Sequence, residues 1–574
     1  MPAHHLPLRP SPPHRQRGAA LLIIVVIMVI GAIALFVTAL NNSNPQISRD
    51  KVTADALAKA KAALIGYATA NGNLPGSLPC PDTNDDGSAE LWSGTACPSY
   101  IGRLPWKTLD IPELRDGSGE ELWYALSSPF RAQTSPAHTI NSDTTGTLNV
   151  TDVTSGASVA SNLVAIVFAP GSALTGPSSP NQSRSSSSTN LCATDGNTEF
   201  DNLCATNYLE SSNKTSTTNT NFNTGAASSS FNDKAIFITH DQLLAPVEMR
   251  IAREAKQCLD NYAAISSNTN HRYPWAVPDT YTSQTGIYNT LFGRIAATPL
   301  TTLTSVDPTY ALTMLNALST LQNALTSYSA NTNATTTSAL LSAGQALITA
   351  SQNAANYSSS SFYDDGYNGY SNITSNSDNA GDAGHDLANG VAGVYVSTVQ
   401  GYIDNTYSYL NSKGFIDGSM PIYWPSGCVF NSSTYWNNWW QEVFYQVASG
   451  NRPGGISGGC TNSCLSISGS GNPNPGSGTY TAAVIVGRAH STTLNSGLPA
   501  SDPPTYYLEG INQNDGTSGS CSSPPFPGGK HSSTKNYSTC PMLSQKFVTY
   551  RPTDPSYSSV NDLVLCLDGQ NNCK

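Results

Sequence analysis

The amino-acid sequence predicts an α+β protein: a long N-terminal helix that begins in a membrane, followed by two tandem heads in which a helix packs on an antiparallel sheet. Three observations predict this fold class. An uncharged apolar segment occupies residues 19–40, and a helical pattern follows it at residues 46–70. Short motifs from the first half also recur, in the same order, in the second half. At 574 residues the chain is long enough for two or three domains.

The apolar segment 19–40 has the length of a membrane span. About 22 residues at a rise of ~1.5 Å reach about 33 Å, which is enough for a bilayer core. Arg9, Arg15 and Arg17 precede the segment, so we expect this flank to stay cytoplasmic and the C-terminal bulk to cross the membrane. A secretory signal peptide has a shorter apolar core and a later cleavage site, whereas here Gly18 directly precedes the apolar run. The alternative is a plain single-span anchor.

This arrangement resembles the leader of type IV pilins and type II secretion pseudopilins, which prepilin peptidase cuts on the cytoplasmic side before methylation. The resemblance implies a leader at residues 1–18, with Gly18 as its last residue and Ala19 as the mature N-terminus. It also implies a single-pass protein of the bacterial inner membrane with a periplasmic C-terminal bulk. Its partners would be other pilins or pseudopilins, which pack on its N-terminal helix in a periplasmic or cell-surface filament.

One position departs from the family pattern. Most pilins carry Glu at the fifth mature residue, where this chain has Ile23. An unpaired charge in lipid is costly, and in the family this Glu pairs with the terminal amine of a neighbouring subunit. The K-type minor pseudopilin, a filament-tip subunit, also lacks the Glu. The resemblance therefore points to a minor subunit that initiates or caps a filament.

Composition favours an extracytoplasmic surface protein. Only 11% of the residues are charged, and the net charge of −11 is spread thinly, with no basic cluster beyond the N-terminal flank. Nucleic-acid binding therefore has no electrostatic support. The sequence contains no G-x-S-x-G, H-E-x-x-H or G-x-x-x-x-G-K-[ST] motif, so we do not expect an enzyme.

All 12 cysteines follow the apolar segment, and their number is even. On the periplasmic side of a membrane this pattern favours disulfides. Zinc is the alternative, but the Cys460-x3-Cys464 spacing has no second pair at zinc-finger distance. Other connectivities fit the same count, and we favour near-neighbour pairs: Cys80–Cys97, Cys192–Cys204, Cys460–Cys464, Cys521–Cys540 and Cys566–Cys573, which leaves Cys258 with Cys428.

The first head is predicted for residues 41–240. Apolar residues recur near 3.6 spacing from residue 46 to 70, which indicates an amphipathic helix. Strands are predicted in the segments 121–128, 163–168 and 231–239. The first of these resembles the turn and strand of pseudopilin heads.

An acidic loop follows the helix, with oxygen-bearing side chains at alternate positions and then a glycine. This pattern fits the D-x-[DN]-x-D-G opening of a calcium loop, because a hard cation needs several converging oxygens. The bidentate Glu of a full EF-hand would fall at Ser93, so the site would be shorter or incomplete. The alternative is an Asp/Asn/Gly turn closed by a disulfide. The candidate Ca²⁺ ligands are Asp82, Asn84, Asp86, Ser88 and Glu90.

The second head is predicted for residues 241–574, because six motifs recur there in order, which indicates a tandem duplication. After its Asp279 this half lacks the acidic residues of the loop, so calcium would be specific to the first head. The matches are Ala60-Lys61-x-x-Leu64-x-x-Tyr67-Ala68 with Ala255-Lys256-x-x-Leu259-x-x-Tyr262-Ala263; Pro81-Asp82-Thr83 with Pro278-Asp279-Thr280; Glu121-Leu122-Trp123-Tyr124 with Glu442-Val443-Phe444-Tyr445; strand 164–168 with 482–486; Tyr208-Leu209-Glu210-x-x-Asn213 with Tyr507-Leu508-Glu509-x-x-Asn512; and Asn232-Asp233 with Asn561-Asp562.

An insertion of about a hundred residues, near 285–395, interrupts the second head. Leucines at helical spacing predict a helical hairpin with helices at 307–328 and 337–355; the K-type pseudopilin also carries an inserted helical domain. We interpret segment 377–386 as a polar, glycine-rich loop. The less favoured alternative is a metal site formed by His385 with Asp378, Asp382 and Asp386. Most of the late tryptophans (Trp424, Trp436, Trp439 and Trp440) are expected in the core.

Three functions fit these observations. The first is a minor pilin or pseudopilin that displays two heads outside the membrane. The second is a tip adhesin, whose second head contacts a surface or glycan. The third and least favoured is an anchored periplasmic enzyme.

Overall fold

The computed structural model has a mixed α+β fold with mainly antiparallel sheets. Within the described residues, no helix is both long enough and apolar enough to cross a membrane. The predicted leader and span lie outside those residues. The structure describes residues 45–91, 96–132, 140–176, 181–192, 197–214, 218–277, 291–301, 309–355, 369–412, 417–430, 435–448, 450–454, 465–468, 479–487, 508, 546–548 and 562–567.

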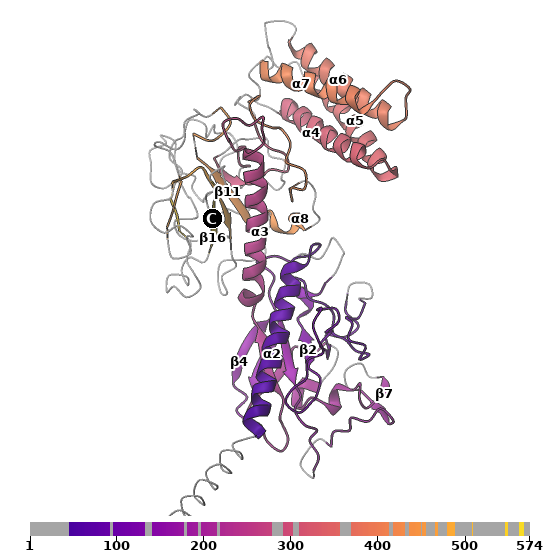
Figure 1. The fold of residues 1–574 in the computed structure, drawn as a ribbon, viewed down its shortest axis with the longest axis vertical. Coiled ribbons are helices and arrows are strands. Elements are labelled where there is room, and N and C mark those ends of the chain that lie inside the picture. The colour runs from indigo at the N-terminus through magenta and orange to yellow at the C-terminus, as the bar shows by residue number, and fades with distance from the viewer. Residues whose placement is uncertain are drawn as a thin grey trace, which may run out of the picture.

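The first head is built on helix α2, which packs on a four-stranded antiparallel sheet of order β1-β2-β5-β9 (Figure 1). Every residue of the central strand β5 is buried, because α2 covers one face and a smaller sheet, β4-β3-β8, covers the other. The bounds are α2 (Pro45–Ala70), β1 (Ile101–Arg103), β2 (Trp123–Leu126), β3 (Leu148–Asp152), β4 (Ser158–Leu163), β5 (Ala165–Ala169), β8 (Asn221–Thr224) and β9 (Lys234–Ile238). A hairpin of β6 (Thr189–Leu191) and β7 (Thr198–Phe200) and the 3₁₀ turns η1 (Ser128–Phe130), η2 (Ala205–Asn207) and η3 (Ser211–Lys214) complete it.

The second head repeats this arrangement around helix α3. Its main sheet has the order β10-β11-β14-β16, again fully antiparallel, and its smaller sheet has the order β13-β12-β15. In both small sheets the middle strand has one antiparallel and one parallel neighbour. The bounds are α3 (His240–Ala263), β10 (Phe292–Arg294), α8 (Trp436–Trp439), β11 (Val443–Val447), β12 (Leu465–Ser468), β13 (Thr479–Tyr480), β14 (Ala482–Val486), β15 (Lys546–Val548) and β16 (Leu563–Leu567).

Equivalent side chains make equivalent contacts in the two heads. Buried residues of α2 recur in α3 at a constant offset of 195 residues, as from Ala60 to Ala255, and both of these are fully buried. The hydroxyl of Tyr124 donates to the Pro79 carbonyl at 3.3 Å, and Tyr445 donates to Pro274 at 3.0 Å. In each head, therefore, a proline carbonyl accepts the equivalent hydrogen bond from a tyrosine hydroxyl.

This equivalence corrects one predicted match. Asp82 bridges to Arg103 in the first head, and Val277 bridges to Arg294 in the second. Asp82 thus corresponds in the fold to Val277, and the match of Pro81 with Pro278 is two residues out of register. The other matched segments fall on equivalent elements wherever both copies are described.

The insertion is a group of four helices rather than a hairpin, and it extends to residue 412. It has its own core, formed mainly by leucine, alanine and valine residues, and it projects from the second head (Figure 1). The predicted helices 307–328 and 337–355 correspond to α4 and α5. The four are α4 (Thr309–Ala330), α5 (Ala334–Ala355), α6 (Gly369–Ala388) and α7 (Val396–Ser412).

The glycine-rich segment 377–386 is part of α6, so the loop interpretation was wrong. Its glycines lie where neighbouring helices pack closely, and they do not form a turn. A Cβ on Gly381 would lie 2.9 Å from the Gly344 carbonyl oxygen of α5, and a Cβ on Gly384 would lie 2.6 Å from a methyl group of Leu321 on α4. Bare backbone at these positions lets α6 approach both neighbours.

Helix α3 belongs to both heads. It begins directly after β9 with a capping box. The Thr239 hydroxyl accepts from the Gln242 backbone amide, and the Gln242 side-chain oxygen accepts from the Thr239 backbone amide. Its first turns contact α2, and it also packs on β14 and β16 of the second head. The four late tryptophans pack in the core of the second head, where none is more than 7% exposed.

Candidate functional site

Three disulfides join described cysteines. The structure connects Cys80 to Cys97, Cys192 to Cys204 and Cys258 to Cys428, with Cα–Cα distances of 5.6, 5.1 and 5.2 Å. Cys566 is also disulfide-bonded, and Cys573 lies outside the described residues. The pairs Cys460–Cys464 and Cys521–Cys540 lie outside them as well and stay predictions.

The acidic loop is organised by hydrogen bonds to its own amides. Asp82 is 1% exposed, and its Oδ1 accepts from the amides of Asn84 and Asp85 at 3.1 and 2.8 Å. Its Oδ2 accepts from the Gly87 amide at 2.7 Å. Gly87 has φ +81°, and a Cβ there would lie 2.6 Å from the Trp106 ring, so the turn needs glycine for both reasons.

The remaining candidate ligands act in the same way. The Oδ1 atoms of Asn84 and Asp86 accept from the amides of Asp86 and Ser88 at 3.1 and 2.7 Å, and Glu90 Oε1 accepts from the amide and hydroxyl of Thr83. Burial raises the pKa of Asp82, whereas the Ser88 amide lowers that of Asp86. These atoms form the turn that the sequence left as the alternative, and calcium binding stays a prediction.

Potential metal ligands gather at another place. Among the described residues, the one group of three His, Cys, Asp or Glu side chains with ligand atoms within 4.8 Å of one another is Cys192, Glu199 and Cys204. Its two sulfurs form a disulfide, which leaves no thiolate to bind a metal. The carboxylates of the acidic loop, and the group at His385 on α6, do not meet this criterion.

The acidic loop, strand β2 and the segment after β7 converge on Arg103. This side chain is buried on β1, and its guanidinium contacts Asp85 Oδ1 and Glu121 Oε2 at 3.0 Å each. It also lies 5.3 and 4.8 Å from the ring centroids of Trp123 and Tyr208. Two carboxylates and two rings therefore already satisfy its charge.

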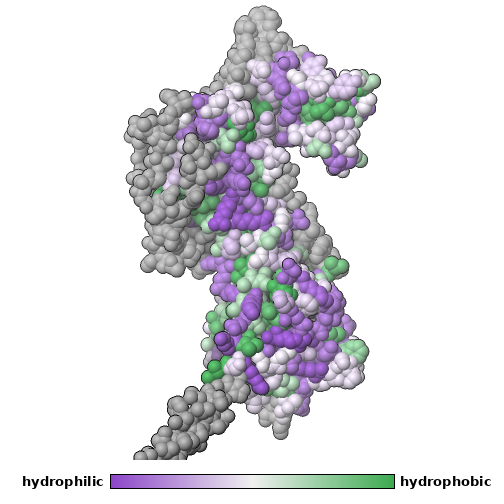
Figure 2. Space-filling model, in the orientation of Figure 1, coloured by the Kyte–Doolittle hydropathy of each residue, from purple (hydrophilic) through white to green (hydrophobic). Residues whose placement is uncertain are grey.

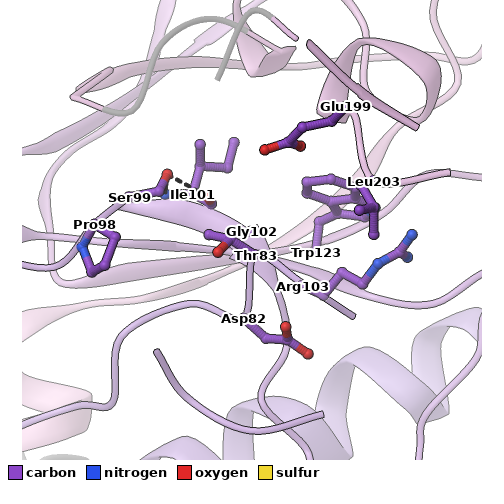
Figure 3. A pocket seen from close by; sticks show the side chains of 10 residues that line it. All are labelled: Asp82, Thr83, Pro98, Ser99, Ile101, Gly102, Arg103, Trp123, Glu199 and Leu203. Carbon is purple, nitrogen blue, oxygen red and sulfur yellow. Dashed lines mark hydrogen bonds between the residues drawn. The ribbon is translucent and has the colours of Figure 1, made fainter. Parts of the chain in front are cut away.

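A small open pocket lies beside this cluster (Figure 3). Asp82 and Arg103 line one side of it, Glu199 lines the other, and Trp123 and Ile101 lie between them. The described lining includes no histidine, lysine or cysteine, and its two hydroxyls donate away from Asp82 and Glu199: Ser99 to the Ile101 carbonyl at 2.6 Å and Thr83 to Glu90 Oε1 at 2.7 Å. The pocket can position a small polar group, but it does not form a recognisable catalytic constellation.

Two motifs of the duplication meet in space, which the sequence did not reveal. Glu210 Oε2 accepts from the amides of Asn232 and Asp233, and Asp233 Oδ2 accepts in return from the Glu210 amide and from Asn213 Nδ2. Burial, with the nearby Glu210, raises the pKa of Asp233 well above its usual range. The second head carries Asp562 at the equivalent place, where it is also buried.

Sequence reasoning also missed a polar cluster where the two heads meet, which we call the junction cluster: the buried residues Ser142, Glu248 and Glu442 with the half-buried Asp143 and His240. Ser142 links both heads, because its amide donates to Glu442 Oε2 at 3.0 Å and its hydroxyl donates to Glu248 Oε1 at 2.8 Å. His240 Nε2 lies 2.8 Å from the Ser142 carbonyl oxygen. The separation of 300 residues between Ser142 and Glu442 explains why no local pattern predicts it.

The fold and these sites define a class: an α+β protein with two heads of equal topology, disulfide cross-links and no recognisable catalytic centre among the described residues. No family model, curated protein or solved structure matches the chain.

Proposed function

We propose that this protein is a minor subunit of a type IV pilus or type II secretion-like filament, inserted in the inner membrane before assembly. The observation that carries the proposal is the sequence from Arg15 to Leu40, in which Gly18 separates a basic flank from an uncharged apolar run. Helix α2 begins soon afterwards, at Pro45, and packs its second half on an antiparallel sheet. A filament subunit needs this combination of a membrane-embedded helix and a head.

The exposed part of α2 is suited to cover by neighbouring helices. Ile47 and Val52 near its start are 62% and 47% exposed. Small residues follow at four-residue spacing on the exposed face, at Ala54, Ala58 and Ala62, and such a row lets another helix approach closely. Figure 2 shows apolar residues at the surface where α2 passes α3, and this surface includes Ile65 and Met249.

Two features support a position at a filament end. Ile23 takes the place of the Glu that pairs subunits in a repeating shaft. The second head and its helices lie far from the start of α2 (Figure 1), and so large an extension on every subunit would crowd a close-packed filament. We therefore favour an initiating or capping role.

Processing tests this proposal directly. The full chain is coexpressed with a prepilin peptidase, and the mature N-terminus is sequenced. We expect it to begin at Ala19 in the wild type, whereas Gly18→Ala stays uncut. The matched control is Gly31→Ala, a glycine inside the apolar run, which should be cut normally. An uncut wild-type chain, or equal cleavage of the Gly18 variant, would refute the proposal.

A tip adhesin remains the second candidate, and exposed tyrosines favour it. Tyr395, which directly precedes α7, and Tyr402, on α7, are 65% and 40% exposed. Aromatic rings at a surface of low charge can stack on sugars or on a partner. Replacing both with serine should abolish attachment without changing filament assembly if the adhesin hypothesis holds. Normal attachment of the double variant would exclude this surface as the adhesive one.

A further inference from the structure

The junction cluster brings three carboxyl groups, those of Asp143, Glu248 and Glu442, close to the imidazole of His240. Glu248 and Glu442 are 2% and 1% exposed, and Asp143 lies beside them on the loop at 140–147. His240, from the first turn of α3, lies among them: it acts on Asp143, it is itself influenced by Glu248, and it also contacts Asp241. Three carboxyl groups thus lie near one imidazole; both glutamates are buried, whereas Asp143 and His240 are half-buried.

Two carboxyl oxygens in this cluster are bare. Glu442 Oε1 and Asp143 Oδ1 are both buried and accept no hydrogen bond within the described part of the chain. Burying an ionised carboxylate with an unsatisfied oxygen costs free energy, and protonation lowers this cost because it removes the negative charge. Burial and the nearby Asp143 raise the pKa of Glu442 well above its usual range, and burial raises the pKa of Asp143.

A proton satisfies this cluster better than a metal ion does. The cluster does not bring three ligand atoms within 4.8 Å of one another, by the criterion that Cys192, Glu199 and Cys204 meet elsewhere in the described chain. Arg294, on β10 of the second head, makes contacts of its own: its Nε donates to the Gln441 carbonyl at 2.9 Å, and its guanidinium lies over the Trp440 and Phe444 rings.

We propose that the junction cluster is a proton-operated latch between the two heads, closed when Glu442 and Asp143 carry protons and loosened when they lose them. In the closed state Ser142 bridges Glu442 of the second head and Glu248 of α3. Loss of protons leaves like charges buried together, and separation of the loop at 140–147 from Glu442 lets water reach them. The latch thereby sets how firmly the second head, with its four inserted helices, is held against the first.

The direction of the pH dependence follows from the pKa shifts of Glu442, an acid, and His240, a base. The raised pKa of Glu442 means that the closed state favours the neutral acid, so its contribution is complete at low pH and is lost as pH rises through that pKa. The pKa of His240 is also raised, despite burial, by hydrogen bonds to Asp241 and Ser142 and by the charge of Glu248. Its contribution is likewise present at low pH and lost as pH rises. Both groups close the latch in acid.

Hydrogen exchange of the full chain in detergent micelles tests this mechanism. The observable is the protection factor of the peptide that contains Ser142, corrected for intrinsic exchange at each pH between 5 and 9. In the wild type we expect protection to fall at least about tenfold as pH rises, the factor that one pKa unit contributes to an opening equilibrium. Glu442→Gln, which is neutral at every pH, should keep protection nearly constant.

Asp404→Asn supplies the control, because Asp404 is an exposed acid on α7, and this variant should retain the wild-type pH dependence. Unchanged protection of β14 shows that each variant is folded. If Glu442→Gln fails that criterion, Asp143→Asn replaces it and should reduce the pH dependence. Protection that does not vary with pH in the wild type, or that varies equally in the folded Gln or Asn variant, overturns the latch.

Discussion

The replacement Gly344→Ala tests the close packing that makes segment 377–386 helical. An added Cβ would lie 2.8 Å from both the Gly381 carbonyl oxygen and the His385 amide nitrogen of α6. Both are backbone atoms, so the helices must move apart by roughly half an ångström to reach ordinary contact distance. Overpacking of this kind costs about 1–3 kcal/mol, and the better helix propensity of alanine offsets about 1 kcal/mol. We expect a net destabilisation of up to about 2 kcal/mol.

The assay must report on the insertion alone, because a chain with several domains does not unfold in one step. Native-state hydrogen exchange of α6 amides meets this need. A loss of about 1.4 kcal/mol corresponds to tenfold faster exchange. The matched control is Gly401→Ala on α7, where a Cβ would meet no atom within 4 Å, and exchange of α7 should slow by a few fold. Slower exchange of α6 in the Gly344 variant, which helix propensity alone predicts, would refute the close-packing argument.

Three further predictions concern both heads. Tyr124→Phe and Tyr445→Phe should each lower the stability of its own head by about 1 kcal/mol, since each loses one buried hydrogen bond; exchange of β5 and β14 measures this, and unequal losses would contradict the equivalence of the two heads. Removing the Cys258–Cys428 disulfide by Cys→Ser at both positions should destabilise the second head by about 2–5 kcal/mol, seen as earlier melting in a thermal scan without reductant, and an unchanged melting profile would contradict this. Asp82→Asn should destabilise the first head with or without calcium, because it weakens three amide contacts, whereas Asp86→Asn should alter calorimetric calcium binding only if the ion binds there.

Several features of the fold were predictable because local pattern encodes them. The apolar spacing at Leu57, Ala60 and Leu64 predicts α2, and the same spacing around Leu259 predicts α3. Runs such as Ala165–Ala169 predict buried central strands. The recurring motifs indicated two similar halves before any tertiary contact was known, since a duplicated sequence repeats its own periodicities.

Other features depended on residues that are distant in sequence. Gly381 and Gly384 indicate a loop by composition, yet they are helical because α5 and α4 lie against them. The acidic residues after Asp82 suggest an ion, and calcium binding stays a prediction, but the sequence did not show that Asp82, Asn84 and Asp86 accept hydrogen bonds from amides of the loop itself. The sequence contained the motifs of Glu210 and Asp233 separately, and nothing in it indicated that these two residues are in contact.

The sequence by itself therefore determined the main helices and central strands of both heads, their order and their repetition, because helix and strand periodicity and duplication are properties of neighbouring residues. Only the tertiary structure decided that α3 serves both heads and that Ser142 joins Glu442 across the junction. Burial and charge proximity arise only when distant segments pack, and they give Glu442 and Asp143 chemical properties that neither residue has in the unfolded chain.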